Sequence, residues 1–262
     1  MKKIVALLLA LLMLTTLFAS CGDKGITLDE VKANGELVIA SSPDFPPFES
    51  LDGQGNVFGI EVEILEAICK DIGVTLKIEQ VDFDSVIPGV IAGKYNVGVS
   101  GISVTEKRLK NSLFTSPYCL AAQSIVVTKD SPIASKADLE GKTVSVQTAT
   151  TAEEFCMNNG YTVNSYVANN DAESALVQGK VDAWVIDDLT AAAMVAEYNA
   201  EHGDELVILS DAMTTEPYAF ALAFGSDTLV EAMNATIEKL LADGTIASIF
   251  EKYDAPYTAP TK

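Results

Sequence analysis

Short apolar runs alternate with amphipathic helical patterns along most of the chain. Residues 37–40 predict one strand and residues 74–78 predict another. Between them, isoleucines recur every four residues from Ile60 to Ile72, which favours a helix that ends at Gly73. This alternation is typical of an α/β fold with mostly parallel sheets.

Polar residues mark further helix ends in the second half of the chain. Residues 151–154 have the pattern of a capping box that opens a helix ending near Gly160. Asp171 and Asp188 stand where they can cap two more helices, and Gly203 follows the second of these. The second half therefore continues the alternation of the first.

One pattern occurs twice. Residues 85–101 contain a short helical segment, a Gly-Lys corner and an apolar strand that ends in small residues. Residues 173–187 contain the same three parts and end in Asp187. The copies stand too far apart for a solenoid repeat, so we expect two similar α/β lobes.

The two copies lead to side chains of opposite charge at strand ends, where open α/β sheets bind ligands. The first leads through the small residues 100–103 to Arg108, whose planar guanidinium matches a carboxylate. The second ends at Asp187, which suits an ammonium group. The alternatives are a solvated Arg108 and a helix cap at Asp187, although Asp188 is also present for capping. A cation and an anion from different lobes favour a zwitterion bound between them.

The N-terminus has the pattern of a secretory signal over residues 1–20. Two lysines precede an apolar run at 4–14 that is too short to span a membrane. Small residues before Cys21 resemble a bacterial lipoprotein signal, which implies acylation of Cys21, a lipidated tether at 21–25 and an extracytoplasmic, membrane-anchored protein. Phe18 stands where that signal usually has Leu, so simple secretory cleavage and a periplasmic location remain the alternative.

Charge and cysteine content exclude other classes of function. The chain carries 37 acidic and 17 basic residues, and this net charge of −20 argues against nucleic acid as a partner. Cys69, Cys119 and Cys156 are widely spaced and the chain has one His, so we expect no metal site and no cofactor. Cys69 lies on the apolar face of its helix, which predicts a buried thiol. A disulfide among the three cysteines remains open.

The segments quoted above resemble the polar amino-acid-binding proteins of ABC transporters, the bacterial family-3 extracellular solute-binding proteins. The resemblance runs from about Leu37 to Tyr253. It rests on many short motifs in the right order, which include LVIASSPDFPPFE at 37–49, GIEVEI at 59–64, SVTEKR at 103–108, FTSPY at 114–118, GKTVSVQ at 141–147 and VDAWVID at 181–187.

The resemblance implies the two-lobed, type II periplasmic-binding-protein fold. Each lobe is a mostly parallel sheet flanked by helices, and two crossing strands join the lobes. The implied boundaries are 26–117 plus 216–262 for lobe 1, 122–211 for lobe 2, and 118–121 and 212–215 for the hinge. A monomer would capture an amino acid between the lobes and deliver it to an ABC permease.

The resemblance also implies roles for individual residues. Arg108 matches the arginine that holds the ligand α-carboxylate, and Gly101 and Ser103 would add a backbone N–H and a hydroxyl or N–H. Thr151 would donate to the same carboxylate from lobe 2. Asp187 matches the acid that pairs with the α-ammonium, with help from the Gly101 carbonyl.

Other positions match residues that hold or select the ligand side chain. Phe45 and Phe83 match aromatic residues on either side of it, with a plain core role as the alternative, and Phe48 is expected in the core. Four positions vary with ligand selectivity: Ser42, Ser100, Gln147 and Ile186. Three residues depart from the family pattern: Glu61 in place of Asp, and Ala149 and Ala219 in place of Gly.

Relatives that select basic amino acids often carry an acid at position 42. Because this chain has Ser42, we expect a polar, neutral amino acid such as glutamine or cystine. One alternative is a cyclohexadienyl or arogenate dehydratase-like enzyme on the same scaffold, for which His202 and Glu216 are the candidate acids. The other is a sensory ligand-binding protein.

Overall fold

The computed structural model describes residues 25–211 and 213–260. The predicted signal at 1–20 and the predicted acylation of Cys21 lie outside the described residues, as does nearly all of the predicted tether at 21–25. Within the described residues, no helix has both the length and the apolar character needed to cross a membrane.

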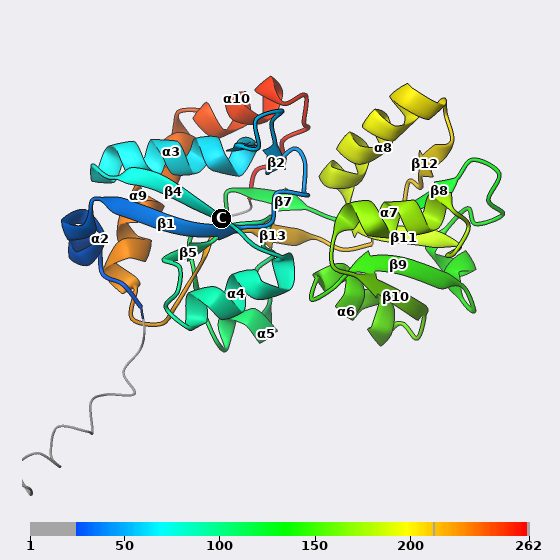
Figure 1. Ribbon diagram of the computed structural model, residues 1–262, viewed down its shortest axis with the longest axis horizontal. Helices are drawn as coiled ribbons and strands as arrows, with labels where there is room; N and C mark the ends of the chain where they lie inside the picture. Colours follow the sequence, from blue (N-terminus) through cyan, green and yellow to red (C-terminus); the bar gives the residue numbers. More distant parts are fainter. Residues whose placement is uncertain (1–24, 212, 261–262) are drawn as a thin grey trace, which may run out of the picture.

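Two α/β lobes lie side by side (Figure 1), each built on a five-stranded sheet. We call lobe 1 the elements on the sheet β4-β1-β5-β14-β6 and lobe 2 those on the sheet β10-β9-β11-β8-β12. In lobe 1 the strands are β1 Glu36–Ser41, β4 Thr75–Gln80, β5 Val97–Gly98, β6 Leu113–Phe114 and β14 Ala221–Leu222. In lobe 2 they are β8 Gln123–Thr128, β9 Thr143–Gln147, β10 Thr162–Tyr166, β11 Ala183–Asp187 and β12 Leu206–Ile208.

The two sheets have the same plan. Three parallel strands come first in each order, β4-β1-β5 and β10-β9-β11, and an antiparallel strand follows. β5 and β11 are the strands of the repeated pattern, and both stand third in their sheet. The prediction of two similar lobes is therefore confirmed, and both strands end at the face between the lobes.

Two antiparallel strands connect the lobes, β7 Cys119–Ala121 and β13 Glu216–Tyr218. The chain leaves lobe 1 through β7 and returns through β13 (Figure 1). β13 begins directly after the range 212–215 that we expected for the second connection. The exact lobe boundaries stay a prediction.

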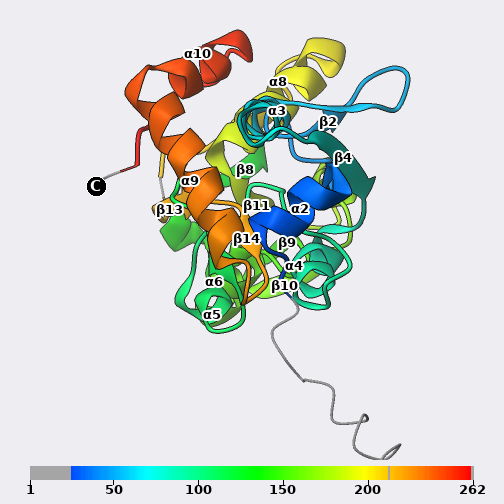
Figure 2. The same cartoon turned by 90° about the vertical axis from the view of Figure 1, so that its left-hand side faces the viewer.

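Helices cover both sheets. Lobe 1 carries α2 Leu28–Asn34, α3 Ile60–Ile72, α4 Phe83–Ile91, α5 Glu106–Leu109, α9 Asp227–Ala242, α10 Thr245–Lys252 and the hairpin β2 Ser50–Leu51 with β3 Val57–Phe58. Lobe 2 carries the short 3-10 helix η1 Lys136–Leu139, α6 Thr151–Asn158, α7 Asn169–Val177 and α8 Asp188–His202. α9 and α10 come from the end of the chain and pack against α3 (Figure 2).

The helix predicted from the isoleucine spacing is α3. All four isoleucines of the series are buried, because residues four apart lie on one face of a helix. Gly73 ends the helix with a φ of 81°, a left-handed conformation that costs glycine little. Cys69 lies on the same buried face, and Cys69, Cys119 and Cys156 are all buried free thiols.

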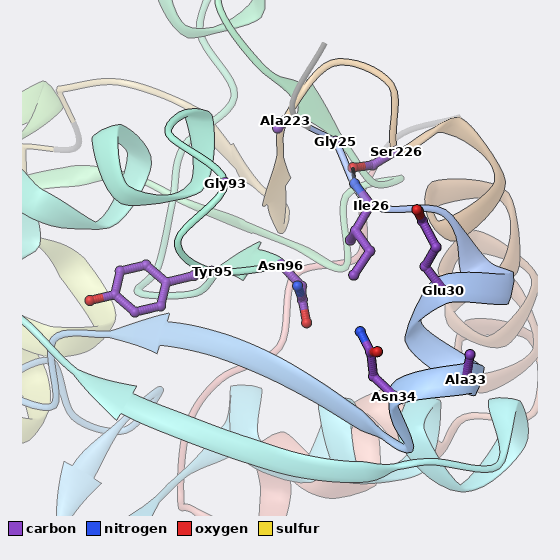
Figure 3. Close-up of a pocket in the computed structure, with 10 residues that line it drawn as sticks. All are labelled: Gly25, Ile26, Glu30, Ala33, Asn34, Gly93, Tyr95, Asn96, Ala223 and Ser226. Carbon is purple, nitrogen blue, oxygen red and sulfur yellow. Dashed lines mark hydrogen bonds between the residues drawn. The ribbon is translucent and has the colours of Figure 1, made fainter. Parts of the chain in front are cut away.

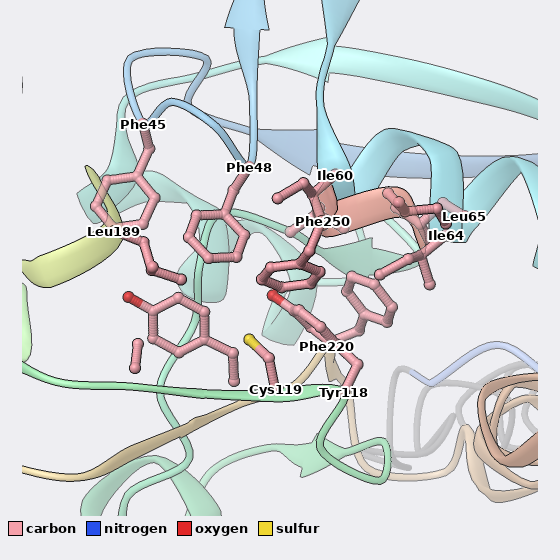
Figure 4. Close-up of a cluster of buried hydrophobic side chains, with 14 of the residues drawn as sticks. Phe45, Phe48, Ile60, Ile64, Leu65, Tyr118, Cys119, Leu189, Phe220 and Phe250 are labelled. Atoms are coloured by element: carbon pink, nitrogen blue, oxygen red, sulfur yellow. The ribbon is translucent and has the colours of Figure 1, made fainter. Parts of the chain in front are cut away.

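An aromatic cluster forms the core of lobe 1 beneath the face between the lobes (Figure 4). Phe48 is fully buried, as expected, and its ring centre lies 5.1 Å from that of Tyr218 and 6.0 Å from that of Phe250. The Phe45 ring stacks against the Phe48 ring, with the ring centres 5.8 Å apart. Closely packed rings of this kind restrict the movement of the side chains that support the site.

Candidate functional site

A small cavity lies between the lobes at the carboxyl ends of their central strands. Its volume of about 10 Å³ is near the minimum that admits one water molecule, so an amino acid needs the lobes to separate in order to enter. Thr150 lines it together with nine of the residues named from the sequence: Phe45, Phe83, Ser100, Gly101, Ser103, Arg108, Gln147, Thr151 and Asp187.

Ser42 and Ile186, which we expected to select the ligand side chain, do not line this cavity. The Ser42 hydroxyl donates to Asp44 Oδ1 at 2.8 Å instead. Ile186 precedes Asp187 in β11, and successive side chains of a strand point to opposite faces. Its side chain therefore packs into the apolar core and does not form part of the cavity wall.

Arg108 is held in place by its backbone and by three neighbours. It lies in α5, and its N–H donates to the hydroxyl of the N-cap residue Thr105 at 3.2 Å. The guanidinium donates to the Ser103 carbonyl at 2.9 Å and, across the cleft, to the Ala149 carbonyl at 3.2 Å. Its carbon Cζ lies 5.7 Å from the centre of the Phe83 ring. A guanidinium has five N–H donors, so three remain for a ligand carboxylate.

Asp187 occupies the N-cap position of α8 but its side chain makes no capping hydrogen bond. The neighbouring carboxylate of Asp188 accepts backbone hydrogen bonds at the start of α8 instead. Its Oδ1 accepts from the Leu189 N–H at 2.8 Å and from the Ala122 N–H at 3.2 Å. Asp187 Oδ1 accepts from Gln123 Nε2 at 2.8 Å. The Asp187 carboxyl is thus directed into the cavity rather than used to start the helix.

The cavity concentrates opposite charges in a buried place. Burial, and secondly the charge of Glu216, raise the pKa of Asp187 to about 8. Burial lowers the pKa of Arg108, whereas the charges of Glu216 and Asp187 raise it. Arg108 stays protonated, since the pKa of a guanidinium is far above neutrality. A ligand ammonium beside Asp187 would favour the ionised carboxylate.

α6 is capped one residue earlier than the sequence predicted. The N-cap is Thr150, whose hydroxyl accepts from the Glu153 N–H at 3.1 Å, and the Glu153 carboxylate accepts from the Ala149 N–H at 2.7 Å. Ala149 adopts a φ of 65°, a conformation that favours glycine. Because Thr150 is the N-cap, Thr151 is not needed for capping, and it lines the cavity.

The structural role of Glu216 was not predicted from the sequence, where we considered this residue only as a candidate acid. It is buried at the start of β13 and joins three parts of the molecule. Its Oε2 accepts from Thr151 of lobe 2 at 2.7 Å and from the Ser103 hydroxyl of lobe 1. Its Oε1 accepts from Thr214 at 2.9 Å. The two hydroxyls expected on the ligand carboxylate therefore bind Glu216 in this closed structure.

Gly101 is packed so tightly against Phe45 that no other residue fits. An added Cβ would lie 2.3 Å from the Phe45 ring, and the φ of Gly101 is 53°. Phe45 is 7 % exposed and belongs to both the core and the cavity wall. The Gly101 N–H donates to Glu61 Oε2 at 2.9 Å, so it is directed away from the position expected for the ligand carboxylate.

Asp44 of lobe 1 forms hydrogen bonds with lobe 2 across the cleft. Its Oδ2 accepts from the backbone N–H of Asn169 at 2.8 Å and from Gln147 Nε2 at 3.0 Å, both in lobe 2. The N-cap residue of α7 is Ala168, which has no side chain that can cap. Asp44 thus supplies a helix cap from the other lobe, with the charge that a helix N-terminus favours.

A larger groove of about 370 Å³ on lobe 1 (Figure 3) lies elsewhere. It is lined by Asn34, which precedes β1, and by Gly93, Tyr95 and Asn96, which precede β5. These are the amino ends of parallel strands, opposite to the end where such sheets bind ligands. Within residues 25–211 and 213–260, no cluster of His, Cys, Asp or Glu is arranged to hold a metal ion.

Comparison with known proteins places the chain in a family. Residues 37–255 match the bacterial extracellular solute-binding proteins, family 3. The chain belongs to this family. Two solute-binding relatives are the L-cystine-binding protein TcyJ of Escherichia coli, 28 % identical over 89 % of this chain and 88 % of the relative, and a probable histidine-binding protein of Neisseria gonorrhoeae, 30 % identical over 97 % and 96 %.

The solved structures of the family share its fold. A mutant of ArgBP from T. maritima superimposes with a TM-score of 0.81 and 38 % identity, over 87 % of this chain and 98 % of that one. The two-lobed fold predicted from the sequence is therefore confirmed, and with it the extracytoplasmic class of solute-binding proteins.

Proposed function

We propose that this chain captures a polar, uncharged L-amino acid between its lobes and delivers it to an ABC permease. The observation that carries the proposal is that Arg108 of lobe 1 and Asp187 of lobe 2 line one buried cavity. Each charge is costly to bury alone, and an α-amino acid supplies a partner to both. Closure of the lobes removes water and strengthens both contacts.

In this proposal the three free N–H groups of Arg108 bind the α-carboxylate. The hydroxyls of Ser103 and Thr151 turn from Glu216 to the ligand as it enters. Asp187 loses its proton and pairs with the α-ammonium. The rings of Phe45 and Phe83 hold the ligand side chain.

Among the described residues, the cavity lining has no charged side chain besides Arg108 and Asp187, which supports a neutral ligand. Asp44 does not line the cavity, and its carboxylate already accepts from Ser42, Gln147 and Asn169. The Gln147 amide is engaged as well, since its Oε1 accepts from Asn169 Nδ2 at 3.1 Å. The relatives named for histidine and cystine, and those named for arginine, set the competing ligands that must be tested.

A thermal-shift screen over the common L-amino acids, cystine and ornithine tests the proposal. A ligand that binds only the folded state raises the melting temperature. We expect the largest shift from a neutral polar amino acid, and loss of that shift in Arg108→Ala but not in the control Lys110→Ala, which is exposed on the same segment. A larger shift from arginine or lysine would contradict the neutral ligand, and no shift from any amino acid would contradict the function.

The positions of the two candidate acids do not favour catalysis. His202 is exposed at the end of α8 and does not line the cavity. Glu216 is held by three hydroxyls, and the relatives above are binding proteins. Incubation with arogenate should therefore give no turnover.

We also propose that Cys21 is acylated and that the chain acts as a monomer. Labelling with a radioactive fatty acid in cells should mark the protein, and Cys21→Ala should remove the label. Size-exclusion chromatography of a chain lacking residues 1–21 should give the mass of one copy. Label retained in Cys21→Ala, or the mass of a dimer, would contradict these proposals.

A further inference from the structure

Two glutamates lie together behind the cavity wall. Glu49 and Glu61 are both fully buried, at 0 % exposure. Neither forms a salt bridge with any Lys, Arg or His of the described residues. Two buried carboxylates without a cation would be unstable side by side, since each lacks both solvent and a counter-charge.

Their hydrogen bonds lead directly to the ligand site. Glu61 accepts from the Gly101 N–H at 2.9 Å on Oε2 and from the Tyr118 hydroxyl on Oε1. Glu49 Oε1 accepts from the Ser100 hydroxyl at 2.8 Å. Glu49 Oε2 is buried and has no other donor among the described residues, but it belongs to the carboxyl that interacts with Glu61.

We propose that Glu49 and Glu61 share one proton and that the pair positions the Ser100–Gly101 segment of the ligand site. The proton resides on Glu49 Oε2 and is donated to the Glu61 carboxylate. Both Glu61 oxygens accept hydrogen bonds, one from the Gly101 N–H and the other from the Tyr118 hydroxyl. The role in binding rests on the proposed function, whereas the shared proton does not.

The surroundings favour this single proton. Burial first, and the charge of Glu61 second, raise the pKa of Glu49 well above its usual range. The other titratable groups that act on the pair are Asp44, Tyr118 and Cys119. None of them is a cation, so none can replace the proton.

The pair fixes the direction of one peptide group. In a trans peptide the carbonyl points opposite to the N–H. With the Gly101 N–H on Glu61, the Ser100 carbonyl points away from Glu61 and is free to accept from a ligand ammonium. Loss of the acceptor on Glu61 would allow this peptide to turn.

Two substitutions separate positioning from general stability. Glu49→Gln replaces the O–H donor by an N–H donor. Its affinity for the amino acid identified in the thermal screen, with L-glutamine tested first, should stay within 3-fold of the wild-type affinity at pH 6, 7.5 and 9. Glu61→Gln leaves one side-chain oxygen for two donors, the Gly101 N–H and the Tyr118 hydroxyl. This variant should stay folded, and its affinity for the amino acid, measured by calorimetry, should fall at least 10-fold. Wild-type affinity in Glu61→Gln, or a 10-fold loss in folded Glu49→Gln, would overturn the positioning role.

The proton itself can be observed without a ligand. The infrared spectrum of the wild-type protein at pH 8 should contain a band of a protonated carboxyl group, and Glu49→Gln should remove it. Burial also raises the pKa of Asp187, Glu173 and Asp188, so Asp187→Asn, Glu173→Gln and Asp188→Asn identify the contribution of each of these carboxyls to the band. A wild-type spectrum without such a band, or a band unchanged in Glu49→Gln, would overturn the shared proton. Absence of amino-acid binding by the wild-type protein would instead contradict the proposed function alone.

Discussion

Replacement of Asp187 by Asn should make the ligand-free protein more stable and unable to bind its ligand. The folded-state pKa of about 8 lies far above the reference value of 3.8. Between these values the folded protein holds a proton that the unfolded chain has lost. Stability from this group is therefore fully present below pH 3.8 and is lost as the pH rises towards 8. Asn cannot ionise and escapes this loss.

The magnitude follows from the size of the shift. A shift of about four pKa units corresponds to an upper limit of ~5 kcal/mol, reached above pH 8. The Asn amide must still be accommodated beside Gln123, so we expect a net gain on the order of 2 kcal/mol at pH 7. The stability difference between variant and wild type should grow with pH by at most ~1.4 kcal/mol per unit.

Urea unfolding of the ligand-free proteins at pH 5, 7 and 8.5 measures this difference, with the exposed Asp204→Asn as control. Calorimetry on the same samples should show at least a 100-fold loss of amino-acid affinity. A variant less stable than wild type at pH 8.5, or a difference independent of pH, would refute the reasoning.

Other predictions follow from the same contacts. Because Asp187 must ionise to bind an ammonium, ligand binding at pH 6.5 should release close to one proton, measured by calorimetry in buffers of different ionisation enthalpy; no release would contradict the pKa of about 8. Asp44→Ala should weaken binding roughly 5- to 30-fold by removing the cap that lobe 1 gives α7, an effect of ~1–2 kcal/mol; unchanged affinity would show that the contact does not stabilise closure. Gly101→Ala should abolish binding and lower the melting temperature, since its Cβ would meet Phe45 at 2.3 Å; a variant of wild-type affinity would contradict the packing. Ala149→Gly should raise the unfolding free energy by ~1 kcal/mol through relief of the left-handed φ; a destabilised protein in urea would contradict this.

The sequence was a good guide wherever periodicity or charge determined the structure. The isoleucine spacing predicted the buried face of α3 and its end at Gly73, because a buried face of a helix must repeat every three to four residues. The repeated pattern predicted two lobes with matched sheets, and strand ends of opposite charge predicted Arg108 and Asp187 in one cavity.

The remaining details depend on contacts that local sequence does not encode. The cap of α7 comes from Asp44, far away in the chain, so the sequence near Ala168 gave no sign of it. Glu216 joins Ser103, Thr151 and Thr214 only after the chain has crossed between the lobes twice. Ile186 was misplaced because a neighbour of a site residue in a strand faces the other way.

The central claim is that both charged groups of an amino acid are held, one by each lobe. The most direct measurement is a calorimetric titration of the wild-type protein with its amino acid, with the corresponding amine that lacks the α-carboxylate, and with the corresponding acid that lacks the α-ammonium. We predict that the amino acid binds and that each analogue loses at least 100-fold in affinity. An analogue that binds as tightly as the amino acid would contradict the pairing of Arg108 and Asp187 with a zwitterion.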